Sequence, residues 1–168
     1  MSRSTWAWIS IGGNKGETLL VVARRLESSI YAMAPLATGP LVQSPRYVTP
    51  PWGGVPQPEF LNQVVGFQTQ VGALEILDAL QAIELDHGRE RVVRWGPRTL
   101  DLDLLMLGQH VVQHDRLTLP HPLLAQRRFV LQPWADVAPQ VQVPGHEQTV
   151  AELLAACPDG SEVSRWSP

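Results

Sequence analysis

Cysteine, lysine and long apolar runs are all scarce in this sequence. Cys157 is the only cysteine, which excludes a disulfide framework and a zinc site built from several cysteines. No apolar run approaches the roughly 18 residues that a membrane span needs, and no basic-then-apolar signal peptide opens the chain. We therefore expect a cytoplasmic protein in a reducing setting, without contact to a membrane.

Charge is sparse as well. Charged residues make up 17% of the 168 positions, and 13 basic against 16 acidic residues give a net charge of −3. That balance provides no general attraction to nucleic acid. The hydrophobic content of 44% can fill a core, which excludes intrinsic disorder. We predict one domain over residues 1–168, with its core at about 6–157 and a frayed C-terminal tail after Cys157.

Apolar periodicity and turn residues divide the chain into strands and helices. Strands are predicted at 6–11, 41–48, 60–71 and 99–107, and helices at about 18–34, 73–86 and 129–138, the last broken near Pro133. Shorter features are a turn at Gly12-Gly13-Asn14, a hairpin within 111–119, a helical turn opening at His121-Pro122, and a last helix begun by a capping box at Thr149. This order predicts an α+β fold: a ferredoxin-like βαββαβ core with C-terminal additions, a partly antiparallel sheet and a three-layer αβα arrangement.

Two long loops interrupt this pattern. The first, residues 49–58, holds four prolines and two glycines in ten residues, which excludes regular structure. The second, residues 88–97, is rich in arginine. Loops of this length inside a compact domain are commonly functional.

Arginine takes the place of lysine almost everywhere. Lys15 is the only lysine among the 13 basic residues, whereas Arg89, Arg91, Arg94 and Arg98 fall within ten positions. The planar guanidinium group binds phosphate oxygens two at a time, so this run indicates a local anion site in an acidic protein. Chance clustering in an arginine-rich chain is the alternative.

Two aspartates follow the arginine run directly. Asp101 and Asp103 are separated by one residue of the predicted strand, so they point to one face about 6–7 Å apart, while Leu100, Leu102 and Leu104 point into the core. Hard divalent cations, Mg²⁺ above all, bind through one or two carboxylates and complete their shell with phosphate oxygens and water. The alternative is a solvated strand face with two acids of no special role, and the neighbouring arginines favour the polyphosphate site.

The common motifs for nucleotide handling are missing. The sequence has no G-x-x-x-x-G-K-[ST], no G-x-G-x-x-G after the first strand, and no protein-kinase signature. Any phosphoryl chemistry must therefore use a separate design.

Five blocks of residues carry a resemblance to one family. They are Thr49-Pro50-Pro51, Phe60-Leu61-Asn62, Gly88-x-x-Arg91, the string Arg94-Trp95-Gly96-Pro97-Arg98-Thr99-Leu100-Asp101-Leu102-Asp103, and Leu119-Pro120-His121-Pro122. In these blocks, and in their order and spacing, the chain resembles the 6-hydroxymethyl-7,8-dihydropterin pyrophosphokinases of folate biosynthesis. The likeness extends from Trp6 to Cys157.

The resemblance implies a transferase of the kinase type, which moves the β,γ-pyrophosphoryl group of ATP to a pterin hydroxymethyl group and releases AMP. It implies two Mg²⁺ ions held by Asp101 and Asp103, with Arg91 and Arg98 as further catalytic residues. The implied ATP-binding residues are Gln81, Glu84, Arg89, Arg91, Trp95, Arg98, Leu104, Thr118, His121 and Arg127. The implied pterin-binding residues are Thr49, Pro50, Pro51, Trp52, Phe60, Asn62, Asp101 and Phe129.

The residues themselves agree with those roles. A flat polar heterocycle needs aromatic faces to stack on, which Phe60 and Phe129 supply, and hydrogen-bonding groups around its edge, such as Asn62. Two positions depart from the family pattern: Phe60 stands where many members have tyrosine, and Trp52 replaces an aliphatic residue. No side chain stands out as a general base.

Two other readings remain open at this stage. A ferredoxin-like sheet can stack bases on aromatic residues, so a non-catalytic nucleic-acid-binding module is the main alternative. The negative net charge and the aspartate pair disfavour it. A catalytically inactive relative is disfavoured because every motif residue with a chemical role is present. We expect a monomer whose partners are ATP and a hydroxymethylpterin, without nucleic acid.

Overall fold

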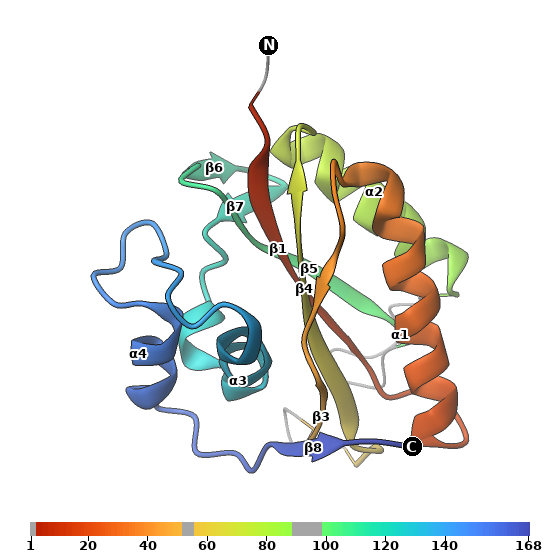
Figure 1. Ribbon diagram of the computed structural model, residues 1–168. Helices are drawn as coiled ribbons and strands as arrows, with labels where there is room; N and C mark the ends of the chain where they lie inside the picture. The colour runs from red at the N-terminus through yellow and green to blue at the C-terminus, as the bar shows by residue number, and fades with distance from the viewer. Residues whose placement is uncertain (1–2, 52–55, 89–98) are drawn as a thin grey trace.

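The computed structural model describes residues 3–51, 56–88 and 99–168, which form one sheet with helices packed on both sides (Figure 1). In chain order the longer elements are β1 (Thr5–Gly13), α1 (Leu19–Met33), β2 (Val42–Gln43), β3 (Arg46–Thr49), β4 (Phe60–Thr69), α2 (Ala73–Asp86), β5 (Asp101–Leu107), β6 (Val112–His114), β7 (Leu117–Leu119), α3 (Arg128–Val137), α4 (Val150–Ala155) and β8 (Ser164–Trp166). Two short 3-10 helices cover Ala34–Leu36 and Leu124–Gln126.

The main sheet has the strand order β5-β1-β4-β3-β8, and β2 also pairs with β4. Each of these pairings is antiparallel. The long strands β1 and β4 lie at the centre, and β5 forms one edge. A separate hairpin, β6-β7, follows β5. The described part of the chain therefore forms a mixed α/β fold with an antiparallel sheet and four α-helices.

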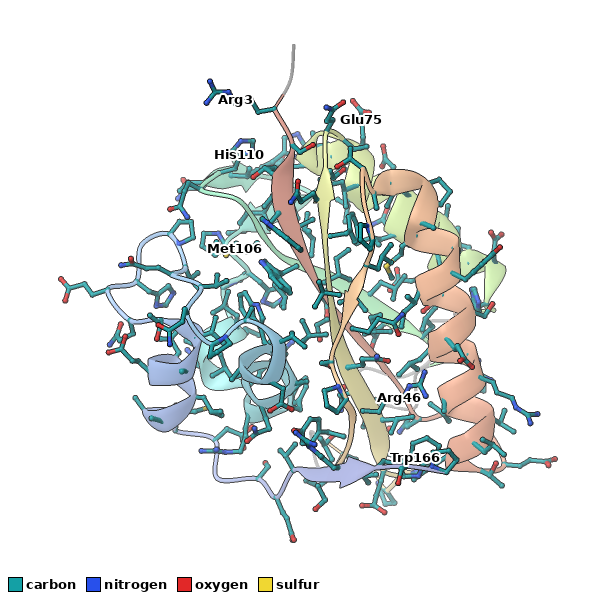
Figure 2. All side chains as sticks on the ribbon, viewed as in Figure 1. Arg3, Arg46, Glu75, Met106, His110 and Trp166 are labelled. Atoms are coloured by element: carbon teal, nitrogen blue, oxygen red, sulfur yellow. The ribbon has the colours of Figure 1, made fainter. Side chains whose placement is uncertain are left out.

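The two faces of the sheet carry separate apolar cores. On one face, α1 and α2 cover a core that includes Ile9, Ile11 and Phe67 (Figure 1). On the other face, α3 and α4 cover a core that includes Trp8 and Val64. Successive residues of a strand point to opposite faces, which explains why Trp8 and Ile9 belong to different cores. Figure 2 shows side chains filling the space on both sides of the sheet.

Elements with strong local signals form where the sequence predicts them. The helix α2 has the predicted bounds, and α1 lies within a residue of its prediction at each end. The capping box of α4 is present, because Thr149 Oγ1 accepts from the Glu152 amide and the Glu152 carboxylate accepts from the Thr149 amide. None of the helices in the described part of the chain has the length and apolar character that a membrane crossing requires.

Four predicted features differ from the structure. Gly12 and Gly13 extend β1 instead of forming a turn, since they pair with β4. The strand predicted at 41–48 is divided into β2 and β3 at Ser44 and Pro45. Pro133 lies inside α3 without breaking it, because proline removes only one helical hydrogen bond and its ring is buried.

The fourth difference is at the C-terminus. Residues after Cys157 were expected to fray, whereas Ser164–Trp166 form β8 and pair with Arg46–Val48 of β3. The free edge of β3 offers unpaired amide and carbonyl groups, and the C-terminal segment satisfies them.

Candidate functional site

The site begins with a row of residues across three strands. Gly12 of β1 is the register partner of both Asn62 on β4 and Asp101 on β5. In the next row, Ser10 faces Asp103 on β5. Paired residues of antiparallel strands point to the same face, so Asn62, Asp101 and Asp103 share the face that α3 covers elsewhere. The structure therefore brings a predicted pterin residue and both predicted metal ligands onto one face of the sheet.

The aspartate pair has the exposure and the chemistry that a hard cation requires. Asp101 and Asp103 are half-buried, whereas Leu102 between them is 5% exposed and packs in the α1–α2 core. Among the described residues there is no group of three or more histidine, cysteine or acidic side chains that could hold a metal. Two carboxylates on one face fit Mg²⁺, which commonly takes one or two protein carboxylates and completes its shell with phosphate oxygens and water.

Asn62 is held in place from two sides. Its side-chain amide donates to Thr49 Oγ1 at 2.7 Å, and both residues are buried. A Cβ at Gly12 would lie 2.6 Å from Asn62 Oδ1, so only glycine fits beside this amide. Gly12 is a site residue that the sequence analysis assigned to a turn. The only local signal is a glycine directly after the predicted end of a strand.

His121, in the segment after β7, lies within electrostatic range of Asp103. Its Nδ1 accepts from the Leu123 amide at 3.1 Å, so the neutral ring carries its proton on Nε2. Burial lowers the pKa of His121; the Asp103 carboxylate opposes this effect and the Arg127 guanidinium adds to it, and the pKa lies below its ordinary value. The lowered pKa favours the neutral ring, in which Nε2–H is the donor, within electrostatic range of Asp103 and Arg127.

Phe129 lies in the first turn of α3, at the same end of the site as Arg127. The Arg127 guanidinium is 5.6 Å from the centre of the Phe129 ring, which is a cation–π distance. The start of α3 is fixed by Asp159, whose carboxylate accepts from the Arg128 amide at 3.1 Å and whose carbonyl accepts from Arg128 Nε at 2.8 Å. The C-terminal segment thus fixes the start of α3, and with it the position of Phe129 in the first turn.

The other residues predicted to bind ATP lie at or near the β5 edge, and they differ in exposure. Gln81 on α2 is exposed, and its Oε1 accepts from Arg116 at 3.2 Å. Thr118 is exposed on β7. The Leu104 side chain is 3% exposed in the α1–α2 core, so this residue can offer a ligand only its backbone. Glu84 is 4% exposed and its carboxylate accepts from the Leu102 amide at 2.9 Å.

Of the residues predicted around the pterin, Thr49 ends β3 and pairs with Phe60 at the start of β4. Phe60 and Pro51 are half-buried, and Pro50 is exposed. Predictions for the following residues lie outside the described part of the chain: Trp52, Arg89, Arg91, Arg94, Trp95 and Arg98.

Two residues to which the sequence assigns no role, Asn14 and Arg25, anchor the segments around the site. Asn14 is 1% exposed, and its amide donates to Gln57 Oε1 and to the Pro58 carbonyl, each at 2.9 Å. Arg25 on α1 donates to the Thr99 carbonyl at 3.2 Å. Asn14 follows a glycine pair, which is a weak local signal, and nothing in the sequence around Arg25 indicates its partner 74 positions away.

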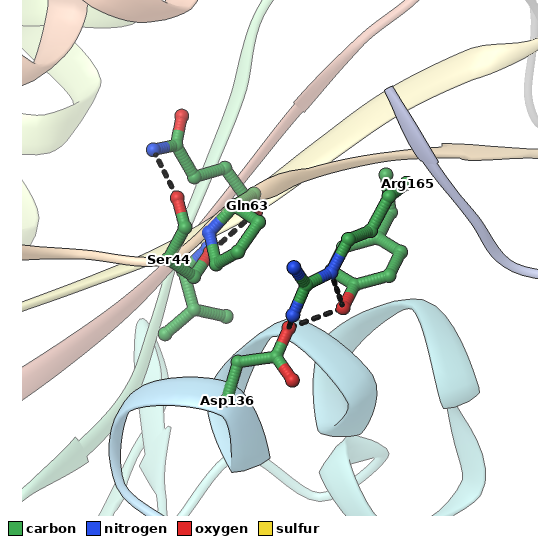
Figure 3. Close-up of polar contacts among 7 residues, drawn as sticks. Ser44, Gln63, Asp136 and Arg165 are labelled. Atoms are coloured by element: carbon green, nitrogen blue, oxygen red, sulfur yellow. Dashed lines mark hydrogen bonds and ion pairs between the residues drawn. The ribbon is translucent and has the colours of Figure 1, made fainter. Parts of the chain in front are cut away.

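A polar network lies beside the same row of residues. Tyr47 of β3, the register partner of Asn62, donates to the Asp136 carboxylate on α3, and Arg165 of β8 donates to the Tyr47 hydroxyl at 3.2 Å (Figure 3). Burial raises the pKa of Tyr47, and the hydrogen bond to Asp136 raises it further. The network joins β3, β8 and α3 on the same face of the sheet as Asn62.

The chain is similar to proteins named as pyrophosphokinases. A relative in Pseudomonas aeruginosa named 2-amino-4-hydroxy-6-hydroxymethyldihydropteridine pyrophosphokinase is 42% identical over 152 residues, which cover 90% of this chain and 91% of the relative. Relatives with the same name are 37% identical in Haemophilus influenzae, covering 88% of this chain and 90% of the relative, and 36% identical in Methylorubrum extorquens, covering 94% and 98%.

Solved structures share the fold. A crystal structure of Plasmodium falciparum HPPK-DHPS with pterin and p-hydroxybenzoate matches with a TM-score of 0.71 at 13% identity, over 92% of this chain and 44% of that chain. The present chain thus spans less than half the length of that solved chain. The model of the 7,8-dihydro-6-hydroxymethylpterin-pyrophosphokinase (HPPK) family matches residues 8–139, and the chain belongs to this family.

Proposed function

We propose that this protein transfers the pyrophosphoryl group of ATP to the hydroxymethyl group of 6-hydroxymethyl-7,8-dihydropterin, giving AMP and the pterin diphosphate in folate biosynthesis. Family membership and relatives named for this pyrophosphokinase activity support the assignment. The observation in this structure that carries it is the row in which Asp101 lies level with Asn62, with Asp103 beside it on the same face. Only Gly12 of β1 lies between Asp101 and Asn62 in this row, which supports phosphate and pterin sites that are close together.

The pterin would lie at the β3–β4 end of this row. Asn62 and Thr49 offer buried hydrogen-bonding groups, and Phe60 and Phe129 offer half-buried aromatic faces. Pro50, Pro51 and Trp52 complete the proposed pterin-binding set, together with Asp101. A flat heterocycle with polar edges is the type of ligand that such a mixture of stacking faces and fixed amides selects.

ATP would lie toward β5, the exposed side of α2 and the β6-β7 hairpin. Gln81 and Thr118 are exposed there, and His121 and Arg127 follow β7. Leu104 would contribute backbone groups, and Arg89, Arg91, Trp95 and Arg98 would contribute side chains from the arginine-rich segment. Guanidinium groups and a neutral imidazole N–H suit the triphosphate, because both donate hydrogen bonds to phosphate oxygens.

Asp101 and Asp103 are the residues that would hold two Mg²⁺ ions. When bound, Mg²⁺ supplies positive charge that stabilises the negative charge spreading over the transferring group and the departing AMP. The remaining work of the protein is positioning, since the substrate hydroxyl attacks the β-phosphorus and the bond to the AMP oxygen breaks. Arg91, Arg98 and Arg127 would bind the phosphate oxygens, and His121 Nε2–H would donate to one of them.

We also propose a topology for the core, an arrangement of layers and an oligomeric state. The strand order β5-β1-β4-β3, with α1 and α2 on one face, supports a ferredoxin-like βαββαβ core. The additional helices on the opposite face support a three-layer αβα arrangement. We further propose a single domain that acts as a monomer in the cytoplasm, with small-molecule substrates and without nucleic acid.

One experiment tests the activity directly. The protein is incubated with Mg-ATP and 6-hydroxymethyl-7,8-dihydropterin, and the nucleotide products are separated. AMP in equal amount to the pterin diphosphate is the expected result. ADP would mean transfer of a single phosphoryl group, and would overturn the proposal.

A further inference from the structure

Glu84 interrupts the apolar face of α2. Ile76, Leu80 and Ile83 of this helix are buried in the α1–α2 core, and Glu84 is buried beside them with 4% of its surface exposed. Burying a carboxylate is costly unless its oxygens accept hydrogen bonds. Here Glu84 Oε2 accepts from the Leu102 amide of β5 at 2.9 Å. An aliphatic side chain at this position would pack without needing a hydrogen-bond partner. The presence of a carboxylate therefore indicates a role beyond packing.

Glu84 accepts a hydrogen bond from the Leu102 amide, which lies at the edge of the described sheet. Among the strands that the structure describes, β5 pairs in the main sheet with β1 on one side. Along an antiparallel strand, backbone amides point alternately toward and away from the paired strand. The Leu102 amide bonds to Glu84 and so points away from β1, while Asp101 and Asp103 flank it along the chain. Glu84 therefore holds β5 at the one residue that separates the two aspartates.

We propose that Glu84 is a positioning residue for the cation-binding aspartates, and that it acts through the backbone of Leu102. This inference rests on the proposed function, and it replaces the predicted contact between Glu84 and ATP. The backbone angles of Leu102 determine the spacing and relative direction of the two neighbouring side chains. Mg²⁺ demands near-ideal octahedral geometry, so the pair has little tolerance for movement of the strand edge.

Direct contact with the nucleotide is a poorer explanation of the same residue. Glu84 is almost fully buried, and its carboxylate would repel the phosphates of ATP. Leu102 points into the α1–α2 core, whereas the aspartates lie on the opposite face. The hydrogen bond to the Leu102 amide thus connects Glu84 to the strand that carries the aspartates.

Two conservative variants separate the hydrogen bond from the charge. Glu84→Gln keeps an acceptor oxygen at the same reach and loses the charge, whereas Glu84→Asp keeps the charge and is one methylene too short. Glu75→Gln and Glu75→Asp, at an exposed position of the same helix, are matched controls. Circular dichroism and thermal melting establish that each variant folds.

Two measurements independent of turnover follow. Mn²⁺ binding is titrated by electron paramagnetic resonance in the presence of a non-hydrolysable ATP analogue, and exchange of the Leu102 amide is measured by NMR. We expect Glu84→Asp to raise the Mn²⁺ concentration for half-saturation by about tenfold or more, in line with other groups that orient metal ligands. We also expect faster exchange of the Leu102 amide in this variant. In Glu84→Gln and in both Glu75 variants, the Mn²⁺ half-saturation and the exchange rate should stay near the wild-type values.

The outcomes distinguish this role from its alternatives. Unchanged Mn²⁺ binding in Glu84→Asp would overturn the inference. An equal loss of Mn²⁺ affinity in Glu84→Asp and Glu84→Gln would also overturn it, because the effect in Glu84→Gln would then arise from the charge of Glu84. The proposed function is judged separately by AMP formation in the wild-type protein. If AMP does not form, Mn²⁺ binding and amide exchange still decide whether Glu84 orients the aspartate pair.

Discussion

At the scale of single residues, Gly12 shows how a missing side chain shapes the site. It lies between Asn62 and Asp101 in the row across the sheet, and a Cβ there would meet Asn62 Oδ1 at 2.6 Å. We predict that Gly12→Ala displaces the Asn62 side chain and weakens pterin binding by about 1–2 kcal/mol, the usual effect of disturbing a buried polar group. Calorimetric titration with the pterin measures the change.

A matched control is available for this substitution. Gly39 has open space where its Cβ would lie, so Gly39→Ala should leave pterin binding unchanged. Equal pterin affinity in Gly12→Ala and the wild type would show that Asn62 does not contact the pterin, or that it tolerates the displacement.

The aspartate pair gives the second prediction at this scale. Asp101→Ala or Asp103→Ala should leave the fold intact, because both side chains are half-buried on a face outside the α1–α2 core. Turnover should fall by a factor on the order of 10³ or more, since the charge stabilisation supplied by the metal is lost. Steady-state assays at saturating Mg²⁺ test this, with the exposed Asp86→Ala as control. Near wild-type turnover in either variant would rule out the assigned metal role.

The sequence predicts a site residue well when its signal is local. The shared face of Asp101 and Asp103 follows from strand alternation alone, and the structure has that alternation. Gly12 and Asn14 depend on distant partners, namely Asn62 and, 43 positions away, Gln57, so the weak local patterns around them do not identify their roles. Glu84 was assigned to ATP by resemblance, and only the structure reveals its bond to the Leu102 amide.

At the scale of elements, α3 begins where the C-terminal segment holds it. The Asp159 carboxylate accepts from the Arg128 amide and from the Ser161 amide. Burial acts to raise the pKa of Asp159, but the hydrogen bonds from Ser161 and Arg128 outweigh it, and the pKa lies below its ordinary value. The carboxylate form is therefore favoured by folding, and Asp159 serves as a helix cap supplied from outside the helix.

We predict that Asp159→Ala lowers the free energy of unfolding by about 1 kcal/mol at pH 7, the usual effect of losing a helix cap. Because the pKa is lowered by folding, this contribution is complete above the unfolded-state pKa and is lost as the pH falls through the folded-state pKa. Urea unfolding of wild type and variant at pH 7 and at pH 3 measures the two differences.

The exposed Glu162→Ala, in the same segment, provides the control for the loss of one negative charge. The capping role would be contradicted if Asp159→Ala lowered the free energy of unfolding as much at pH 3 as at pH 7.

Elements divide in the same way as residues into those that the sequence predicts and those it does not. The helices α1 and α2 follow from periodicity, since a repeat of three to four residues is a property of the segment itself. The strand β8 has three residues and forms only because the edge of β3 is available. Pro133 was expected to break α3, but the burial of that helix against β4 and α4 keeps it continuous.

At the scale of the whole molecule, the sheet separates two cores, and polar contacts connect the parts around it. Tyr47 is 4% exposed, and its hydroxyl donates to Asp136 on α3 and accepts from Arg165 on β8. Three segments far apart in the sequence therefore meet at one phenol. Tyr47 is also the register partner of Asn62, so this junction lies beside Asn62 on the face of the sheet that α3 covers.

The last prediction uses the ionisation of this phenol. Burial and the Asp136 carboxylate raise the pKa of Tyr47 in the folded protein. Its contribution to stability is therefore complete below the unfolded-state pKa and is lost as the pH rises through the folded-state pKa. Tyr47→Phe should lower the free energy of unfolding by about 1 kcal/mol at pH 7, as expected for the loss of a hydrogen-bonded hydroxyl. Above about pH 10, the usual tyrosine pKa, that difference should shrink.

The only other tyrosine provides the control, since Tyr31 on α1 is 84% exposed and Tyr31→Phe should change stability little at any pH. Urea unfolding of the three proteins between pH 7 and pH 11 measures the differences, and pterin titration at pH 7 shows whether the junction also supports the pocket. If the difference in free energy of unfolding between the wild type and Tyr47→Phe stayed constant from pH 7 to pH 11, the Tyr47 phenol would not ionise on unfolding. Any loss of stability at alkaline pH would then come from other ionisable groups.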